Sequence, residues 1–276
     1  MPLSDQQLRF FDTFGYLAFP GLLADRIQSV IDEFDGIWKA HGGGHHGKVH
    51  DGTARSCIVQ FIDRSDALSS LLDDPRIYSI AQSLLGDEFN YMGSDGNYYA
   101  GETGWHSDGW HATVKHIKIA FYLDQLDGTN GALRVVPGSH RVGDGYAESL
   151  QKSLFDCGGS FAMHGRDIPA VALATKPGDI VCFNHNTKHS SFNGGQRRRM
   201  FTINLCQRYP EERPEELRDY IKGFARFWIE RVYGPQMMAT AGPARMRQLE
   251  QVMANDGHLA ELSRAAQASM PEPSRG

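Results

Sequence analysis

The region from about residue 90 to residue 209 constrains the fold most, because it reads as many short strands. Runs rich in β-branched and aromatic residues alternate there with clusters of turn-forming residues. The clearest runs span residues 116–123, 133–136, 179–183 and 200–205, and the turn clusters span residues 93–96, 127–131 and 194–195. Short strands separated by Gly, Asn and Asp are typical of antiparallel sheets. The pattern therefore predicts a mainly β fold with an antiparallel barrel or jelly-roll core.

Helical signals flank this β region on both sides. A capping pattern at Ser4 and Gln7 predicts a helix that ends at Gly15. The cap at Asp74, followed by a proline and by apolar residues at helical spacing, predicts another helix. The other expected elements are a strand at 16–19, helices from about 25, at 217–228 and at 243–265, and a frayed tail at 270–276.

We expect one domain of 276 residues, which is long enough to bury a large single core. Its expected parts are a helical N-terminal part at about 1–89, a β core at about 90–209 and C-terminal helices at about 210–268. No internal repeat and no linker divides the sequence.

The charge pattern argues against a nucleic acid or a membrane as partner. The net charge is −5, and the 28 Lys and Arg residues are dispersed apart from residues 197–199, so no basic stripe is present. No apolar run is long enough to cross a bilayer, and residues 1–5 do not resemble a secretory signal. We therefore expect a cytoplasmic protein. The four cysteines form no C-x-x-C pair, so buried, reduced thiols are expected.

His106 and Asp108 lie two positions apart in the β region, a spacing that places both side chains on one face of a strand. His189 follows a turn and an apolar run, so it adds a second imidazole from another strand. Two imidazoles and a carboxylate on one face of an octahedral metal leave three positions open for chemistry. An H-x-D triplet alone arises by chance about once in such a chain. The alternative is that His106 and Asp108 form a surface turn and His189 is a hydrogen-bonded core residue.

Two longer segments resemble the phytanoyl-CoA dioxygenase family of Fe(II)- and 2-oxoglutarate-dependent oxygenases. Residues 130–141, NGALRVVPGSHR, are similar to the family's signature turn, and residues 176–190 are similar to the segment that carries its distal iron ligand. The resemblance implies a double-stranded β-helix, cupin-like core, with His106, Asp108 and His189 as catalytic iron ligands. It also implies Fe(II), 2-oxoglutarate and dioxygen as cofactors. The implied reaction is hydroxylation or another oxidation of a small organic metabolite, with release of succinate and CO2.

The resemblance further implies that an arginine within residues 197–199 binds the C5 carboxylate of 2-oxoglutarate. Family members have a longer Gly-Ser-Gly-x-Asn loop before this arginine than this chain has. Strand alternation separates the candidates: Arg198 shares a face with Thr202 and Asn204, whereas Arg199 shares one with apolar residues. We therefore expect Arg198 to line the cavity, with Arg199 as the alternative.

Lys118 and Tyr98 are further candidates for contacts to the cosubstrate. Lys118 alternates with apolar residues on its predicted strand, so it faces either the cavity or solvent. Tyr98 shares strand parity with His106, although glycines lie between them. Trp105 and Trp110 flank the metal motif and form either the substrate pocket or ordinary packing.

Residues 41–50 contain four histidines among glycines. A metal-binding tract is one interpretation. Glycine-rich backbone is too flexible to preorganise a tight site, so a mobile loop that orders over the substrate is favoured. His140 is expected to be structural. His185 lies four residues before His189 but in a β-like region, where this spacing does not form a helical metal pair, so it is not counted as a ligand.

Two other functional classes fit the same triad. One is a cupin-like metal-binding protein without oxidative activity. The other is a zinc hydrolase, since two histidines and a carboxylate also bind zinc with a water. A hydrolase would leave the predicted buried arginine without a role. The expected partner is a small-molecule substrate of unnamed identity, and the C-terminal helices either cover the barrel or form a homo-oligomer.

Overall fold

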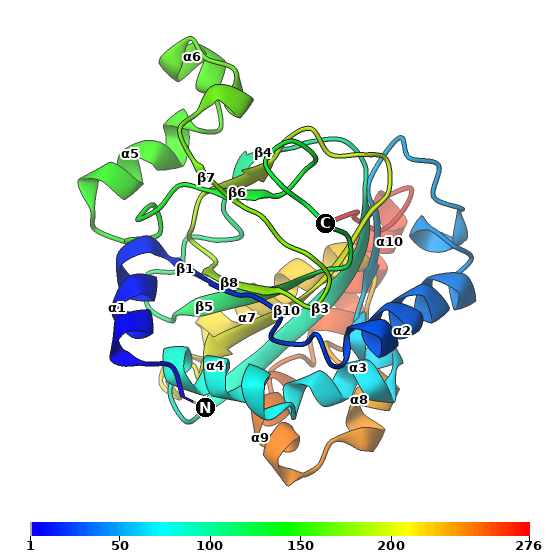
Figure 1. The fold of residues 1–276 in the computed structure, drawn as a ribbon. Helices are drawn as coiled ribbons and strands as arrows, with labels where there is room; N and C mark the ends of the chain where they lie inside the picture. Colours follow the sequence, from blue (N-terminus) through cyan, green and yellow to red (C-terminus); the bar gives the residue numbers. More distant parts are fainter. Residues whose placement is uncertain (1) are drawn as a thin grey trace.

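Within residues 2–276, which the computed structural model describes, the strands form two antiparallel sheets that face each other (Figure 1). The larger sheet has the order β1 (Tyr16–Phe19), β8 (Ile180–Asn184), β5 (His116–Tyr122), β10 (Arg198–Gln207), β3 (Phe89–Tyr99) and β2 (Ser56–Val59). The smaller sheet has the order β4 (Thr103–His106), β9 (His189–Ser191), β6 (Leu133–Val135) and β7 (Val171–Leu173). The predicted antiparallel jelly roll is confirmed.

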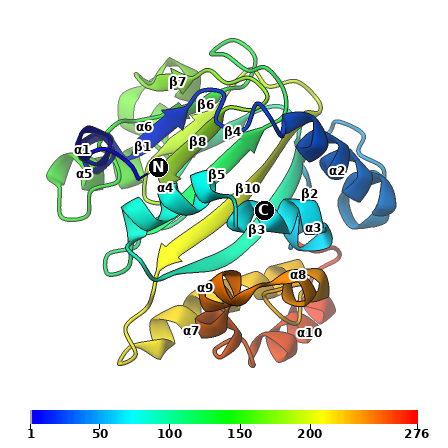
Figure 2. The same ribbon diagram turned by 60° about the horizontal axis from the view of Figure 1, so that its bottom comes forward.

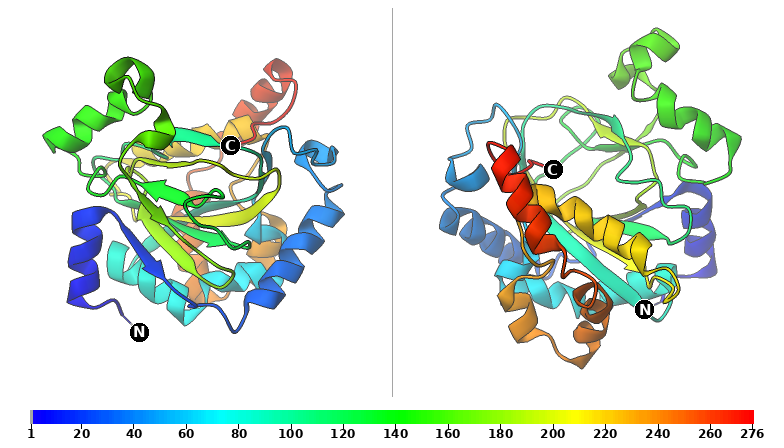
Figure 3. Two further views of the ribbon diagram at one scale, coloured as in Figure 1. Left: turned by 45° about the horizontal axis from the view of Figure 1, so that its top comes forward. Right: turned by 180° about the vertical axis from the view of Figure 1, so that it is seen from behind.

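Helices surround the larger sheet, and α3 and α4 lie across one of its faces, with α7 to α10 gathered beside it (Figure 2). The α-helices are α1 (Asp5–Phe14), α2 (Ile27–Ala40), α3 (Asp66–Ser69), α4 (Pro75–Leu85), α5 (Gly145–Ser153), α6 (Cys157–Phe161), α7 (Pro214–Lys222), α8 (Pro235–Thr240), α9 (Pro243–Met253) and α10 (Leu259–Ser269). Short 3-10 helices are η1 (His45–Gly47), η2 (Ile62–Arg64), η3 (Ser70–Leu72), η4 (Gly165–Asp167) and η5 (Gly223–Phe227). The sequence analysis did not predict α5 and α6, which project from the end of the molecule near the smaller sheet (Figure 3).

The predicted caps form as expected. In α1 the Ser4 side chain accepts a hydrogen bond from the Gln7 N–H, and Gln7 reaches back to the Ser4 N–H, so both ends of the capping box are satisfied. Gly15 ends this helix in the left-handed conformation with φ of 85°. Asp74 caps α4 by accepting from the Arg76 N–H. Local hydrogen bonding thus determines where these helices begin and end.

Aromatic side chains fill the space between α2 and the larger sheet. The ring of Phe61 lies 5.1 Å from that of Phe34 and 5.8 Å from that of Phe201, and all three residues are fully buried. Trp38 of α2 stacks on Tyr98 of β3 with 4.1 Å between ring centroids. Burying a side chain such as Phe contributes roughly 1.5–3 kcal/mol. This cluster therefore fixes α2 against one face of the sheet and leaves the opposite face for a cavity.

The segment 93–96 is not a turn, as predicted, but part of the strand β3. Gly93, with φ of +112°, lies at a β-bulge where the pairing of β3 with β10 shifts after Asn204. A Cβ on Gly96 would lie 2.1 Å from the Phe61 ring, so this glycine makes room for close packing. The turn prediction is wrong because both glycines serve the strand.

The single helix predicted over 243–265 is also wrong, because the structure has two helices, α9 and α10, with a break between them. Buried Asp256 lies in the break and accepts hydrogen bonds from Arg231 Nε and from the Val232 N–H, both at 3.0 Å. These contacts stabilise the interruption, after which α9 packs against β3 and α10 packs against η5 and α7.

Two segments predicted to be mobile, 41–50 and 270–276, are hydrogen-bonded to each other and to the sheet. His45 is buried, and its Nε2 donates to the Pro273 carbonyl at 2.9 Å. Its Nδ1 lies 3.0 Å from the Cys57 carbonyl oxygen and 3.4 Å from the Cys57 backbone nitrogen. Polar contacts from both ring nitrogens explain why a glycine-rich loop takes one conformation here.

Among the helices of residues 2–276, none combines the length and the apolar character that crossing a bilayer requires. The four cysteines are free and buried, as expected. Burial raises the pKa of the Cys57 thiol to about 12, which makes this side chain an unreactive packing group.

Candidate active site

A cavity of about 660 Å³ lies between the two sheets. This volume falls within the range of ~300–1,000 Å³ that is typical of small-molecule sites. Strands of both sheets and part of the segment 220–232 form its wall. The residues that line it include His106, Asp108, Lys118, His189 and Arg198. The residues singled out by the metal motif and by strand alternation therefore face one enclosed space.

The strand pairing brings the three candidate metal ligands together. His106 ends β4 and His189 begins β9, and the two residues are paired across the smaller sheet. One nitrogen of each imidazole and one oxygen of Asp108 lie within 4.8 Å of one another. Nδ1 of His106 donates to the Gly104 carbonyl and Nδ1 of His189 donates to the Thr187 carbonyl, both at 2.8 Å. Each Nε2 therefore carries the lone pair that a metal needs.

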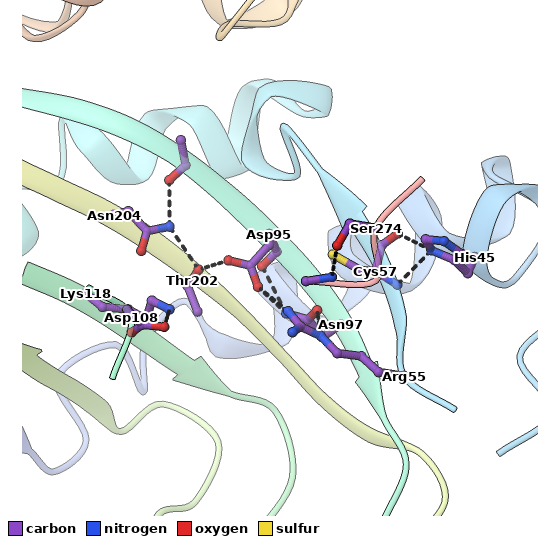
Figure 4. A network of polar contacts seen from close by, with 12 residues as sticks. His45, Arg55, Cys57, Asp95, Asn97, Asp108, Lys118, Thr202, Asn204 and Ser274 are labelled. Carbon is purple, nitrogen blue, oxygen red and sulfur yellow. Dashed lines mark hydrogen bonds and ion pairs between the residues drawn. The ribbon is translucent and has the colours of Figure 1, made fainter. Parts of the chain in front are cut away.

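Electrostatics keep these ligands in their metal-binding forms. Lys118 Nζ lies 2.8 Å from Asp108 Oδ1 (Figure 4). Burial would raise the pKa of Asp108, but Lys118 and the neighbouring imidazoles outweigh it and hold the pKa well below its usual range. Burial lowers the pKa of His189 to about 3. Asp108 is thus a carboxylate and His189 is a neutral imidazole at neutral pH.

The donor set fits Fe(II). Two imidazole nitrogens and one carboxylate on one face are the ligands of non-haem iron oxygenases, and the remaining positions stay open. The hydrogen bonds from each Nδ1 to a backbone carbonyl fix both rings, as is usual for histidines that bind metals. The site therefore meets the requirements of such an iron centre in ligand type, protonation and orientation.

Arg198 supplies a buried positive charge to the same cavity. Its side chain is 6% exposed, and its Nη1 donates to the Gly131 carbonyl and to the Ser191 hydroxyl. A Cβ on Gly131, where φ is +102°, would lie 2.3 Å from this nitrogen, so glycine permits the close approach. Within residues 2–276 no carboxylate forms an ion pair with Arg198. A buried guanidinium without an anion is an unfavourable state that a bound carboxylate would relieve.

Arg199 and Tyr98 were predicted as candidate contacts to the cosubstrate, but neither lines the cavity. Arg199 forms ion pairs with Asp124 at 2.9 Å and with Asp35 at 3.2 Å. The Tyr98 hydroxyl accepts from Arg197 Nη2 at 2.9 Å on the face packed against α2. Strand alternation turns Arg199 to the other face of β10. The parity between Tyr98 and the metal motif fails because the turn between β3 and β4 interrupts the strand.

A polar wall of the cavity, formed by residues of β3 and β10 and by Arg55 just before β2, was not predicted from the sequence (Figure 4). Arg55 Nη2 lies 3.1 Å from Asp95 Oδ2, and Arg55 Nε donates to Asn97 Oδ1 at 2.8 Å. The Thr202 hydroxyl also donates to Asp95. Burial would raise the pKa of Asp95, but Lys118 and Arg55 outweigh it and lower the pKa. The strand alternation that places Arg198 in the cavity also places Thr202 there. Asp95 was not recognised, because residues 93–96 were predicted to form a turn.

The tryptophans beside the metal motif have different roles. Trp105 lines the cavity and its Nε1 donates to the Gly165 carbonyl at 2.8 Å. The ring of Trp110 lies 3.8 Å from the buried ammonium of Lys188, which is a cation–π contact within the scaffold. Trp105 thus shapes the cavity, while Trp110 packs beside it.

The sequence profile of the phytanoyl-CoA dioxygenase (PhyH) family matches residues 11–200. The chain belongs to this family. The ectoine dioxygenase of Sphingopyxis alaskensis is 28% identical over 217 residues, which are 69% of this chain and 71% of the relative. The ectoine dioxygenase of Bordetella bronchiseptica is 32% identical over 149 residues, which are 46% of this chain and 48% of the relative.

Solved structures agree with this membership. The iron-bound structure of EctD from S. alaskensis is 26% identical with a TM-score of 0.57, and the match covers 75% of this chain and 77% of that one. The carbocyclase SnoK from nogalamycin biosynthesis, which is 20% identical, shares the fold with a TM-score of 0.57 over 74% of this chain and 84% of its own. The double-stranded β-helix and the predicted family are therefore confirmed. The protein is an Fe(II)- and 2-oxoglutarate-dependent dioxygenase that acts on a small metabolite.

Proposed function

We propose that this dioxygenase holds iron with His106, Asp108 and His189, and anchors the C5 carboxylate of 2-oxoglutarate with Arg198. The observation that carries this proposal is Arg198 itself. It is a buried cation without an ion-pair partner among residues 2–276, in the cavity that also contains the triad. A guanidinium recognises a carboxylate through two parallel hydrogen bonds. Oxidation of the substrate would accompany release of succinate and CO2.

We propose two roles for Lys118, one as the ion-pair partner of Asp108 and one as a hydrogen-bond donor to the cosubstrate. Its ammonium neutralises the carboxylate when no metal is bound, which stabilises an otherwise isolated buried charge. Bound Fe(II) would supply the coordination positions at which 2-oxoglutarate and dioxygen react. Lys118 would then be free to donate a hydrogen bond to a cosubstrate oxygen. Its place in the cavity supports this second role.

We further propose that the substrate is small and carries polar or charged groups of both signs. The cavity wall offers the guanidinium of Arg55 and the carboxylate of Asp95, whose side chains are 25% and 18% exposed. Phe224 and Phe227 add apolar surface, and a site with a few convergent polar groups on an apolar wall orients its ligand. Ectoine appears in the names of the relatives described above. It is a zwitterion and is therefore the first compound to test.

Two measurements test the proposal. Anaerobic addition of Fe(II) and 2-oxoglutarate should give the visible charge-transfer absorption of a chelated iron complex, and Arg198→Gln should weaken it at a given 2-oxoglutarate concentration. Succinate release should then rise with a small zwitterion such as ectoine. Stimulation by long-chain acyl thioesters alone would refute the proposed substrate class. Absence of the charge-transfer absorption in the wild type would refute the proposed iron and cosubstrate sites.

A non-oxidative cupin-like role or a zinc hydrolase would leave Arg198 without an anion to bind, so neither is favoured. Residence in the cytoplasm and a homo-oligomeric state stay predictions from the sequence.

A further inference from the structure

Three other histidines, His111, His116 and His185, cluster beside the iron triad but contribute nothing to it. His111 lies in the loop between β4 and β5, His116 begins β5, and His185 follows β8. One nitrogen of each lies within 4.8 Å of the others. The rings of His111 and His116 are stacked with 3.8 Å between centroids. We refer to these three residues as the histidine cluster.

Each ring presents a buried nitrogen that has no hydrogen-bond partner among residues 2–276. These atoms are Nε2 of His111, Nδ1 of His116 and Nδ1 of His185. His116 and His185 are 1% and 2% exposed. Buried polar atoms almost always have partners, and leaving one unsatisfied is destabilising. Three such atoms in one cluster of imidazoles therefore indicate a missing ligand.

The other nitrogens of the two most buried rings are occupied. His185 Nε2 donates to Asn204 Oδ1 at 3.2 Å, because the amide nitrogen of Asn204 already donates to the Gly93 carbonyl. The free Nδ1 of His185 therefore carries a lone pair. His116 Nε2 lies 2.8 Å from the Tyr209 hydroxyl. Such outer hydrogen bonds orient histidines that bind metals.

The backbone holds the cluster in place without help from a ligand. The His185 N–H donates to the His116 carbonyl at 3.0 Å. The Asn186 side chain accepts from the His111 N–H at 2.7 Å and donates to the His111 carbonyl at 3.0 Å. A Cβ on Gly109 would lie 2.3 Å from His111 Nε2, so glycine leaves space for this ring. The backbone of the three residues is thus held by contacts that do not use the three unpaired nitrogens.

We propose that His111, His116 and His185 bind a second divalent metal of the zinc class, with water as the fourth ligand. Neutral imidazoles suit Zn²⁺, Co²⁺ and Ni²⁺ better than Mg²⁺ or Ca²⁺. Zn–N bonds of about 2.1 Å place tetrahedral nitrogens roughly 3.4 Å apart, so the stacked rings of His111 and His116 would turn relative to each other when a metal binds.

This second site would support the iron centre. The Asp108 N–H donates to the His185 carbonyl at 2.9 Å. A metal bound to His185 and His111 would therefore restrain Asp108 in two ways. It would hold the carbonyl to which the Asp108 N–H donates, and it would hold His111, three residues later in the chain. The inference does not depend on the iron assignment, because the histidine cluster shares no ligand with the triad.

Cobalt titration of the full-length, metal-free protein tests the site, with bound Co²⁺ counted by equilibrium dialysis and its geometry followed by visible absorption. The wild type should bind two equivalents. His106→Ala combined with His189→Ala removes the iron site and should leave one equivalent with a tetrahedral spectrum. Adding His111→Ala should abolish this remaining binding, whereas adding His164→Ala, the loss of an exposed histidine elsewhere, should not.

A second variant separates metal binding from folding. Tyr209→Phe keeps the ring but removes the hydrogen bond to His116, and it should weaken cobalt binding at the cluster roughly 10- to 100-fold. Near-ultraviolet circular dichroism should show the same folded signal in each variant. If the variant without the iron site binds no Co²⁺, or if His111→Ala leaves its binding unchanged, the second site does not exist. If the wild type binds only the equivalent that His111→Ala removes, the result would instead count against the proposed triad.

Discussion

Replacing Arg198 with glutamine tests the proposed cosubstrate anchor most directly. Arg198→Gln keeps a polar side chain of similar length but removes the positive charge. Arg198 is 6% exposed as a residue, so its pairing with a carboxylate takes place largely out of water. Breaking a buried, hydrogen-bonded charge pair costs about 2–5 kcal/mol. Since each 1.4 kcal/mol is a factor of ten, the KM for 2-oxoglutarate should rise about 30- to 4,000-fold.

The assay is succinate formation at saturating Fe(II) over a range of 2-oxoglutarate concentrations. The kcat at saturating 2-oxoglutarate should change far less than KM, because the proposed contact of Arg198 is to the end of the cosubstrate that does not react. Thermal denaturation gives an independent measure. A ligand at about 100 times its dissociation constant stabilises the folded state by roughly 2.7 kcal/mol. Arg198→Gln should lose this stabilisation at the concentration that saturates the wild type.

Arg199→Gln is the matched control. Arg199 lies next to Arg198 in sequence but points to the opposite face of β10, where it pairs with Asp124 and Asp35. Its side chain is 26% exposed, and partly exposed ion pairs contribute about 0–1 kcal/mol. The KM for 2-oxoglutarate should therefore stay within about twofold of wild type. If Arg199→Gln raises KM and Arg198→Gln does not, the argument from strand alternation is refuted.

Three further changes test the site and the scaffold. Asp108→Ala should reduce succinate formation to background, because the triad loses its carboxylate; full activity would contradict the assigned role. Burial raises the pKa of Asp63 to about 6, so the folded protein keeps a proton that the unfolded chain loses near pH 4. The free energy of unfolding should therefore fall by about 3 kcal/mol from this group between pH 4 and pH 6. Urea denaturation should show this component in the wild type and not in Asp63→Asn. Gly96→Ala should lower Tm, because overpacking against Phe61 costs about 1–3 kcal/mol, whereas Gly36→Ala on helix α2 has open space and should raise it.

Local signals predicted the parts of this fold that depend on local interactions. The capping box at Ser4 and the cap at Asp74 form as predicted, because each needs hydrogen bonds only to residues nearby in sequence. The alternation along β10 likewise placed Arg198 on the polar face, since successive side chains of a regular strand alternate between faces. The same rule failed for Tyr98, because a turn separates it from the residue with which it was compared.

Contacts between distant segments explain the errors. Gly96 looks like a turn residue in sequence, but its lack of a Cβ is required by Phe61, 35 positions away, whose ring occupies that space. The assumption of a turn concealed Asp95 and with it the polar wall of the cavity. His45 likewise looked like part of a flexible glycine-rich loop, although its Nε2 bonds to Pro273 near the other end of the chain. Neither partner is visible from spacing or propensity.

The histidine cluster, which is the proposed second metal site, could not be predicted from the sequence for the same reason. His116 and His185 come together because β5 pairs with β8, with Ile117 opposite Asn184, and this pairing follows from the strand order of the whole sheet. His111 joins them through the Asn186 clamp on a loop. No short motif encodes such a set, whereas the iron triad has one in His-x-Asp. A metal site assembled by strand order can therefore be recognised only after folding, by the unpaired nitrogens that it leaves in the interior.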